Sequence, residues 1–167
     1  RDSLTLQGDL YDSQPGASNL SGGNILGRWT RQLSPTSSTM VQLYYNRAEQ
    51  QATDSPETKY REKRKTVDLE LQYNFQPTSS HNLVVGGGYR FSKDETGWLS
   101  PYVFIDPENK TEHLTSLFLQ DGIQLIPEIL NLNLGVRAEH NDYTGFELHP
   151  TARMAWTPNL QHSLWGA

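Results

Sequence analysis

The chain of 167 residues carries a formal net charge of −5, and 35% of its residues are hydrophobic and 20% charged. This length allows one domain, an aromatic content of 10% argues against a chain that stays unfolded, and the acidic balance argues against nucleic-acid binding. No run of 18 apolar residues occurs, so no transmembrane helix is expected. Membrane-crossing strands are not excluded, because they alternate apolar and polar residues. The lack of cysteine excludes disulfides and thiol chemistry.

Apolar and polar residues alternate with a period of two from the N-terminus onward, which is typical of two-faced strands. The first such segment has Leu4, Leu6 and Leu10 on one face. Further candidate strands follow at 23–33, 39–47, 66–75, 81–92, 112–125, 130–139 and 146–157, and another begins at about His162. The only possible helical turn is Pro127-Glu128-Ile129. We therefore predict an all-β fold, an antiparallel up-and-down meander of about 8 long strands.

The connections between these segments alternate in length along the chain. Short connections, each with a proline, are expected at 34–38, 76–80, 126–129 and 158–161, and longer polar ones at 12–22, 48–63, 93–111 and 140–145. In a meander, every second connection lies at the same end of the sheet. One short rim and one long rim are typical of outer-membrane barrels, whereas a soluble β-sandwich gives no reason for this segregation.

Aromatic residues form two groups along the candidate strands. Those near the short connections are Trp29, Phe75, Trp156 and Trp165, and those toward the other end are Tyr45, Tyr89 and Phe91. Two such bands are expected at the two interfaces of a membrane. In a soluble β-sandwich the same residues would be core.

Few residues suggest reaction chemistry. Asp68 and Glu70 share a strand face, as an acid–base pair would, but Thr66, Gln72 and Asn74 continue the same polar row, which favours the wall of a barrel lumen. The five histidines show no close metal-ligand spacing, and the three glycines at 86–88 lack the spacing of a phosphate-binding loop. We predict no enzyme activity, no metal and no cofactor.

Four segments near the C-terminal end, in order and at fitting distances, resemble the TonB-dependent outer-membrane receptors. They are the run SLFLQDGIQL at 116–125, LNLGVRAEHN at 132–141, HPTARMAWTP at 149–158 and HSLWGA at 162–167. They are similar to the family's FxQD, LGxR, PxARxAW and LWGA strand motifs. The segments 22–29 and 43–47 are similar in style but less specific.

The resemblance implies that residues 1–167 form the central part of a 22-stranded transmembrane β-barrel, without the N-terminal plug domain and the C-terminal strands. It further implies a receptor in the bacterial outer membrane that takes up a scarce ligand such as a ferric siderophore or cobalamin, contacting the TonB complex only through the missing plug region. This segment would supply barrel wall and extracellular loops. A soluble β-rich binding or structural domain and a complete small 8-stranded outer-membrane barrel remain alternatives.

Two sets of residues are candidates for binding. Five cations at 59–65 would reach lipopolysaccharide phosphates from an extracellular strand end, namely Lys59, Arg61, Lys63, Arg64 and Lys65. A solvated loop or ligand contact are the other interpretations of this charge run. The long connection at 93–111 carries Trp98, Tyr102 and Phe104, which would grip a ligand or pack within the loop.

Overall fold

The computed structural model describes residues 1–55, 58–99, 106–159 and 161–167, with the side chains of these ranges except at 53–55, 58, 98 and 99. The described residues form nine β-strands, which are β1 (Asp2–Ser13), β2 (Ser18–Ser34), β3 (Ser37–Ser55), β4 (Thr58–Thr78), β5 (His81–Leu99), β6 (Asn109–Ile126), β7 (Leu130–Asn141), β8 (Gly145–Asn159) and β9 (His162–Gly166). No helix among these ranges is long and apolar enough to cross a membrane.

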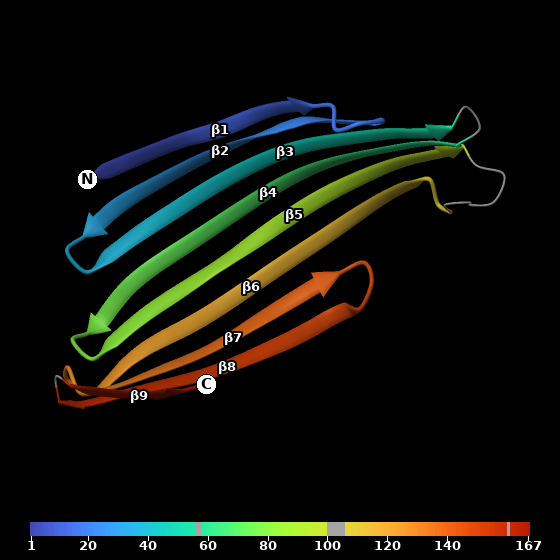
Figure 1. The fold of residues 1–167 in the computed structure, drawn as a ribbon. Helices are drawn as coiled ribbons and strands as arrows, with labels where there is room; N and C mark the ends of the chain where they lie inside the picture. The colour runs from blue at the N-terminus through green and yellow to red at the C-terminus, as the bar shows by residue number, and fades with distance from the viewer. Residues whose placement is uncertain (56–57, 100–105, 160) are drawn as a thin grey trace.

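The nine strands make one antiparallel sheet in which every strand pairs with its neighbours in the chain (Figure 1). The predicted up-and-down meander is therefore confirmed, with β9 as the ninth strand. β1 and β9 lie at opposite edges of the sheet, so the described strands do not close a barrel among themselves. The possible helical turn at 127–129 is instead a tight turn with Glu128 at φ 62°.

The strands continue much further than the alternating pattern predicted. β3 runs to Ser55 and β4 resumes at Thr58, so most of the expected loop at 48–63 is a paired hairpin, and the expected connection at 12–22 is likewise mostly strand. Among the described side chains of these extensions, polar ones occur on both faces, which obscures the period of two. The ladder continues because cross-strand pairs such as Glu49 with Lys63 keep its register.

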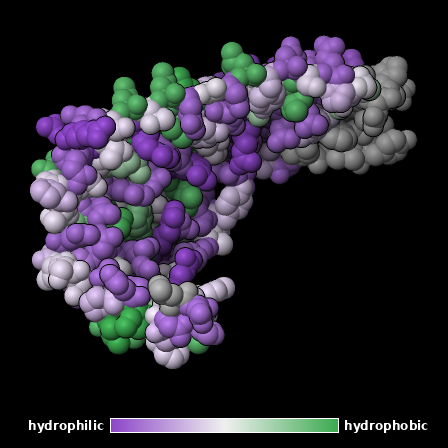
Figure 2. Space-filling model, turned by 60° about the vertical axis from the view of Figure 1, so that its left-hand side comes forward, coloured by the Kyte–Doolittle hydropathy of each residue, from purple (hydrophilic) through white to green (hydrophobic). Residues whose placement is uncertain are grey.

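The two faces of the sheet have opposite character. On β4, Val67, Leu69 and Leu71 point to one face, and Asp68 and Glu70 point to the other. The sheet curves around a hollow in which hydrophilic residues predominate, while hydrophobic groups stand out on its outer side (Figure 2). No hydrophobic residue is buried in the described part of the chain. This single layer has no core of its own, and its apolar convex face needs a non-aqueous neighbour.

Most of the aromatic residues expected near the short turns lie on the convex face. Trp29 is in register with Val41, and the rings of Tyr73 and Phe75 stack with their centroids 5.2 Å apart. Trp165 is in register with Ala155, on the side of the polar rows. The aromatic band at this end therefore lacks Trp165, because the side that a residue faces depends on register and not on its distance from a turn.

Candidate functional site

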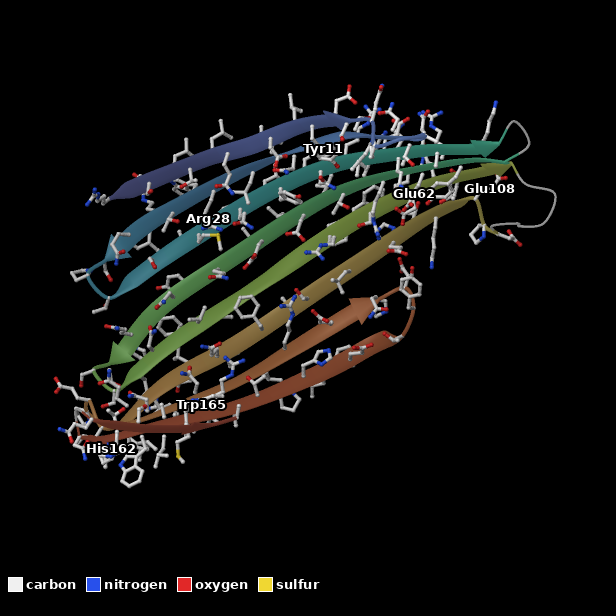
Figure 3. All side chains as sticks on the ribbon, in the orientation of Figure 1. Tyr11, Arg28, Glu62, Glu108, His162 and Trp165 are labelled. Carbon is white, nitrogen blue, oxygen red and sulfur yellow. The ribbon has the colours of Figure 1, made fainter. Side chains whose placement is uncertain are left out.

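A groove of about 770 Å³ lies on the concave face toward the end of the sheet with the longer connections. Strands β3 to β8 and the β7–β8 turn supply its lining, which includes Tyr44, Asn46, Arg64, Arg90, Asn141 and Tyr143. These side chains meet because antiparallel pairing aligns the polar rows of successive strands. The same rows continue along the sheet, with Arg28 on β2 and Glu62 on β4 marked among the side chains of Figure 3.

The arginines of the groove are held by carboxylates from neighbouring strands. Arg90 Nε donates to Asp68 Oδ2 at 2.7 Å. Arg64 Nε lies 3.2 Å from Asp94 Oδ1, and Arg64 Nη2 lies 3.3 Å from Glu112 Oε2. Burial raises the pKa of Asp94 although Arg64 acts in the opposite direction. The guanidinium groups are thus neutralised and fixed in place.

Tyr143 anchors the β7–β8 turn to β6. Its hydroxyl donates a hydrogen bond to Glu112, and Lys110 Nζ lies 3.6 Å from the centroid of its ring. The backbone N–H of His113 donates to Asp142 Oδ2 at 2.6 Å. A turn that carries an exposed aromatic ring is therefore fastened at the mouth of the groove.

A second charged group on β7 and β8 includes Glu139 and Glu147, which belong to the lining of the groove. One ligand atom from each of Glu139, Glu147 and His149 lies within 4.8 Å of the others, so this group could hold a cation. Arg137 Nε already lies 2.6 Å from Glu139 Oε1, which makes an ion-pair network the simpler description. Glu147 and His149 share a face by spacing, but their proximity to Glu139 depends on strand register.

Asp68 and Glu70 are engaged in separate contacts rather than paired for acid–base chemistry. Asp68 binds Arg90, and Glu70 Oε1 accepts a hydrogen bond from Gln72 Nε2 at 2.6 Å. Both carboxylates belong to the polar row that the sequence indicated.

The run of cations at 59–65 is divided between the two faces. The odd-numbered cations point to the convex side, namely Lys59, Arg61, Lys63 and Lys65. The even-numbered Arg64 lines the concave groove. Among the candidates for ligand binding, Trp98 lies in β5 with its side chain outside the described part, and Tyr102 and Phe104 lie outside the described residues.

A curved antiparallel meander with a polar concave face and an apolar convex face is a segment of the wall of a large β-barrel. A comparison with known protein families supports this assignment to a barrel wall. The family model described as "TonB dependent receptor-like, beta-barrel" matches residues 1–166. The chain therefore belongs to the TonB-dependent receptor family, whose members are receptors and transporters of the bacterial outer membrane.

Solved structures share the fold at low sequence identity. The ferric enterobactin receptor PfeA of Pseudomonas aeruginosa, as a mutant, superimposes with a TM-score of 0.74 at 14% identity, covering 89% of this chain and 25% of that one. The structure of FpvAI in complex with pyocin S2 superimposes with a TM-score of 0.71 at 16% identity, covering 89% of this chain and 26% of that one.

The siderophore receptor PirA of Pseudomonas aeruginosa gives a TM-score of 0.52 at 14% identity, covering 95% of this chain and 36% of that one. The chain thus spans about a quarter of the length of the first two structures. No curated protein sequence matches it.

Proposed function

We propose that this chain forms part of the wall of an outer-membrane receptor that takes up a scarce ligand such as a ferric siderophore or cobalamin. In this arrangement the convex face contacts lipid, and the concave face lines the lumen. Contact with the TonB complex belongs to a plug region that these residues do not include. Residues 1–167 are then one part of a barrel domain.

The opposite character of the two faces is the observation that carries this proposal. The apolar row on β4 runs from Val67 to Phe75, beyond which Lys65 follows on the same face. This length agrees with the about 9–11 residues that a tilted strand needs to cross a bilayer. The solved structures named above as receptors for ferric enterobactin and siderophores share the fold, which supports uptake as the function.

The groove on the concave face is the place where we expect the ligand to touch this segment. Tyr44 and Tyr143 offer aromatic surface, and Asn46 and Asn141 offer both donors and acceptors. The arginines are already paired, so recognition here relies on neutral polar and aromatic contacts. Trp98 near the end of β5 and Tyr102 and Phe104 in the β5–β6 connection remain candidates for further contacts.

The test is ligand binding and uptake by the full-length receptor with Tyr44→Ala and Asn46→Ala combined. Neither substitution removes an ion pair. We expect at least a tenfold loss of affinity, equivalent to about 1.4 kcal/mol. The probes are radioiron-loaded enterobactin and radiolabelled cobalamin. The matched control is Tyr45→Ala, because Tyr45 lies between the two positions and points to the convex face.

Equal losses of ligand affinity in the double variant and in the Tyr45→Ala control, at the same amount of folded barrel, would contradict ligand binding in the groove. Failure of the unaltered receptor to take up either probe would contradict the uptake of these ligand classes. Independent loss of binding in Trp98→Ala and Tyr102→Ala variants would extend the site to the end of β5 and the β5–β6 connection.

A further inference from the structure

Two carboxylates face each other on adjacent strands at the β7–β8 side of the groove. The register pairs Glu139 of β7 with Glu147 of β8, and both residues line the groove. Like charges directly opposite each other on neighbouring strands destabilise a sheet. This pairing therefore favours a positively charged group between the two carboxylates.

An imidazole nitrogen lies beside both carboxylates. His149 Nε2 is 3.2 Å from Glu147 Oε2 and 3.6 Å from Glu139 Oε2. One ligand atom from each of the three residues lies within 4.8 Å of the other two. We call Glu139, Glu147 and His149 the Glu–Glu–His triad. Its members come from two strands, so the spacing of histidines in the sequence does not indicate it.

The outer oxygens of both carboxylates have partners of their own. Arg137 Nε lies 2.6 Å from Glu139 Oε1, and the hydroxyl of Thr144 donates a hydrogen bond to Glu147 Oε1. These contacts leave the Oε2 atoms directed toward His149. Without an ion the group is an ion-pair network, and the same contacts orient the carboxylates for a cation, as the outer partners of metal ligands do.

The separations of the donor atoms fit a small divalent transition-metal ion. Zinc binds imidazole nitrogen and carboxylate oxygen at about 2.0–2.2 Å, which places the ligand atoms of a tetrahedral site about 3.3–3.6 Å apart. The distances of 3.2 and 3.6 Å from His149 Nε2 are close to this range. Calcium and magnesium prefer oxygen ligands throughout. The imidazole therefore favours a zinc-like ion over either of them.

The triad is short of positive charge and open to solvent. Among the described residues, no Lys or Arg nitrogen lies within 4.0 Å of a Glu147 carboxylate oxygen. The side chains of Glu147 and His149 are exposed at 35% and 48%. A hydrated ion can therefore reach the triad from the concave side of the sheet.

We propose that the Glu–Glu–His triad binds one divalent transition-metal ion of the Zn²⁺ type. Three protein ligands leave a fourth tetrahedral position for water or for a donor atom of a molecule in the groove. The ion offsets the facing carboxylates and joins β7 to β8 beside the turn that carries Tyr143. This inference does not depend on ligand uptake, because all three metal ligands lie on two neighbouring strands of this chain.

The experiment measures metal binding to the metal-free full-length receptor in detergent by isothermal titration calorimetry. The probes are Zn²⁺ and Ca²⁺. We expect one site that binds Zn²⁺ at least tenfold more tightly than Ca²⁺. His149→Ala should weaken Zn²⁺ binding at this site at least tenfold, and so should Glu139→Gln combined with Glu147→Gln.

The matched control is His140→Ala. His140 directly follows Glu139 on β7 and points to the opposite face of the sheet, so this substitution should leave Zn²⁺ affinity within twofold. Heat-modifiable migration in electrophoresis verifies that each variant is a folded barrel.

A second measurement reports the imidazole ligand directly. Co²⁺ bound in place of Zn²⁺ should give the intense visible absorption of tetrahedral coordination, and His149→Ala should remove it while His140→Ala retains it. Absence of Zn²⁺ binding in the unaltered receptor, or equal Zn²⁺ affinities in the two histidine variants, would overturn the proposal. Displacement of Zn²⁺ by Ca²⁺ at equal concentration would overturn the assignment to a transition metal.

Discussion

Arg64 and Lys65 are consecutive cations on β4, yet they lie in different electrostatic surroundings. Arg64 points into the concave groove between carboxylates of β5 and β6, at 3.2 Å from Asp94 and 3.3 Å from Glu112. Lys65 points to the convex face, where its cross-strand neighbours are the cations Arg47 and Lys93. The sheet thus balances charge on one face and accumulates it on the other.

This comparison extends along the whole of β4. Asp68 and Glu70 make polar contacts on the concave face, while Leu69 and Leu71 lie on the convex face exposed at 38% and 50%. An alternation that places charges inside and leucines outside is the reverse of a soluble sheet packed on a core. The difference between the faces therefore provides the sharpest tests of how the chain is used.

The largest expected effect is that of a charge on the convex face. Leu69→Arg in the full-length receptor should cost about 2–4 kcal/mol of folding free energy in a bilayer, because a cation would enter hydrocarbon. Glu70→Arg places the same side chain on the concave face and should cost much less. The measurement is folding into lipid vesicles against urea. Equal costs for the two variants would remove the distinction between the faces.

A smaller effect is expected where the concave face is closely packed. A methyl group at Gly86 would lie 2.5 Å from the backbone oxygen of Leu71 and 2.5 Å from Phe118 Cζ. Since the backbone cannot yield cheaply, Gly86→Ala should destabilise the barrel by about 1–3 kcal/mol. At Gly97 a methyl group would meet no atom of the described residues within 4 Å, so Gly97→Ala is the control. Equal thermal stability of both variants would refute the close packing.

The smallest effect concerns the acid dependence of the convex ion pairs. Hydrogen bonds from Gln51, Arg61 and Arg47 lower the pKa of Glu49 from 4.5 to about 2. Because the pKa is lowered in the folded state, this stabilisation is present above pH 4.5 and is lost as the pH falls toward 2. The Tm of the unaltered receptor should therefore approach the Tm of the Glu49→Gln variant as the pH falls from 4.5 toward 2.

The Arg61→Gln variant provides the check on this titration. It removes the two hydrogen bonds that Arg61 donates to Glu49 Oε1, so the pKa of Glu49 should rise, and carboxyl resonances in an NMR titration report it directly. A midpoint near 4.5 in the unaltered receptor would contradict the cross-strand pairing of Glu49.

Much of the fold could be predicted from local pattern alone. Leucines alternating with polar residues, as at 130–139, define a two-faced strand without any knowledge of its neighbours. Proline-containing turns at 34–38 and 76–80 separate successive strands, which requires antiparallel order. The resemblance of the four C-terminal segments to the TonB-dependent receptors is confirmed by the family match over residues 1–166.

The extent of the hairpins was not accessible to the same reasoning. In the sequence 48–63, polar residues occupy most odd and even positions alike, so alternation gives no signal, and the strand over its described residues depends on register passed on from the apolar part of β3 and β4. The meeting of Glu139 with His149 likewise requires two strands to be aligned. Such contacts join residues on different strands at no fixed spacing in the sequence, so no sequence motif indicates them.

The sequence by itself determined a two-faced antiparallel sheet, because period-two alternation and turn chemistry are local properties. The TonB-dependent receptor family came instead from the resemblance of four C-terminal segments to the family's strand motifs, which the match over residues 1–166 confirms. Only the tertiary structure decided which charges are neutralised and which are not. It placed Arg64 on the concave face and Lys65 on the convex face, where Arg47, Lys65 and Lys93 lie in one row across three strands. The physical reason is that electrostatic surroundings depend on distances between strands, which register and curvature set.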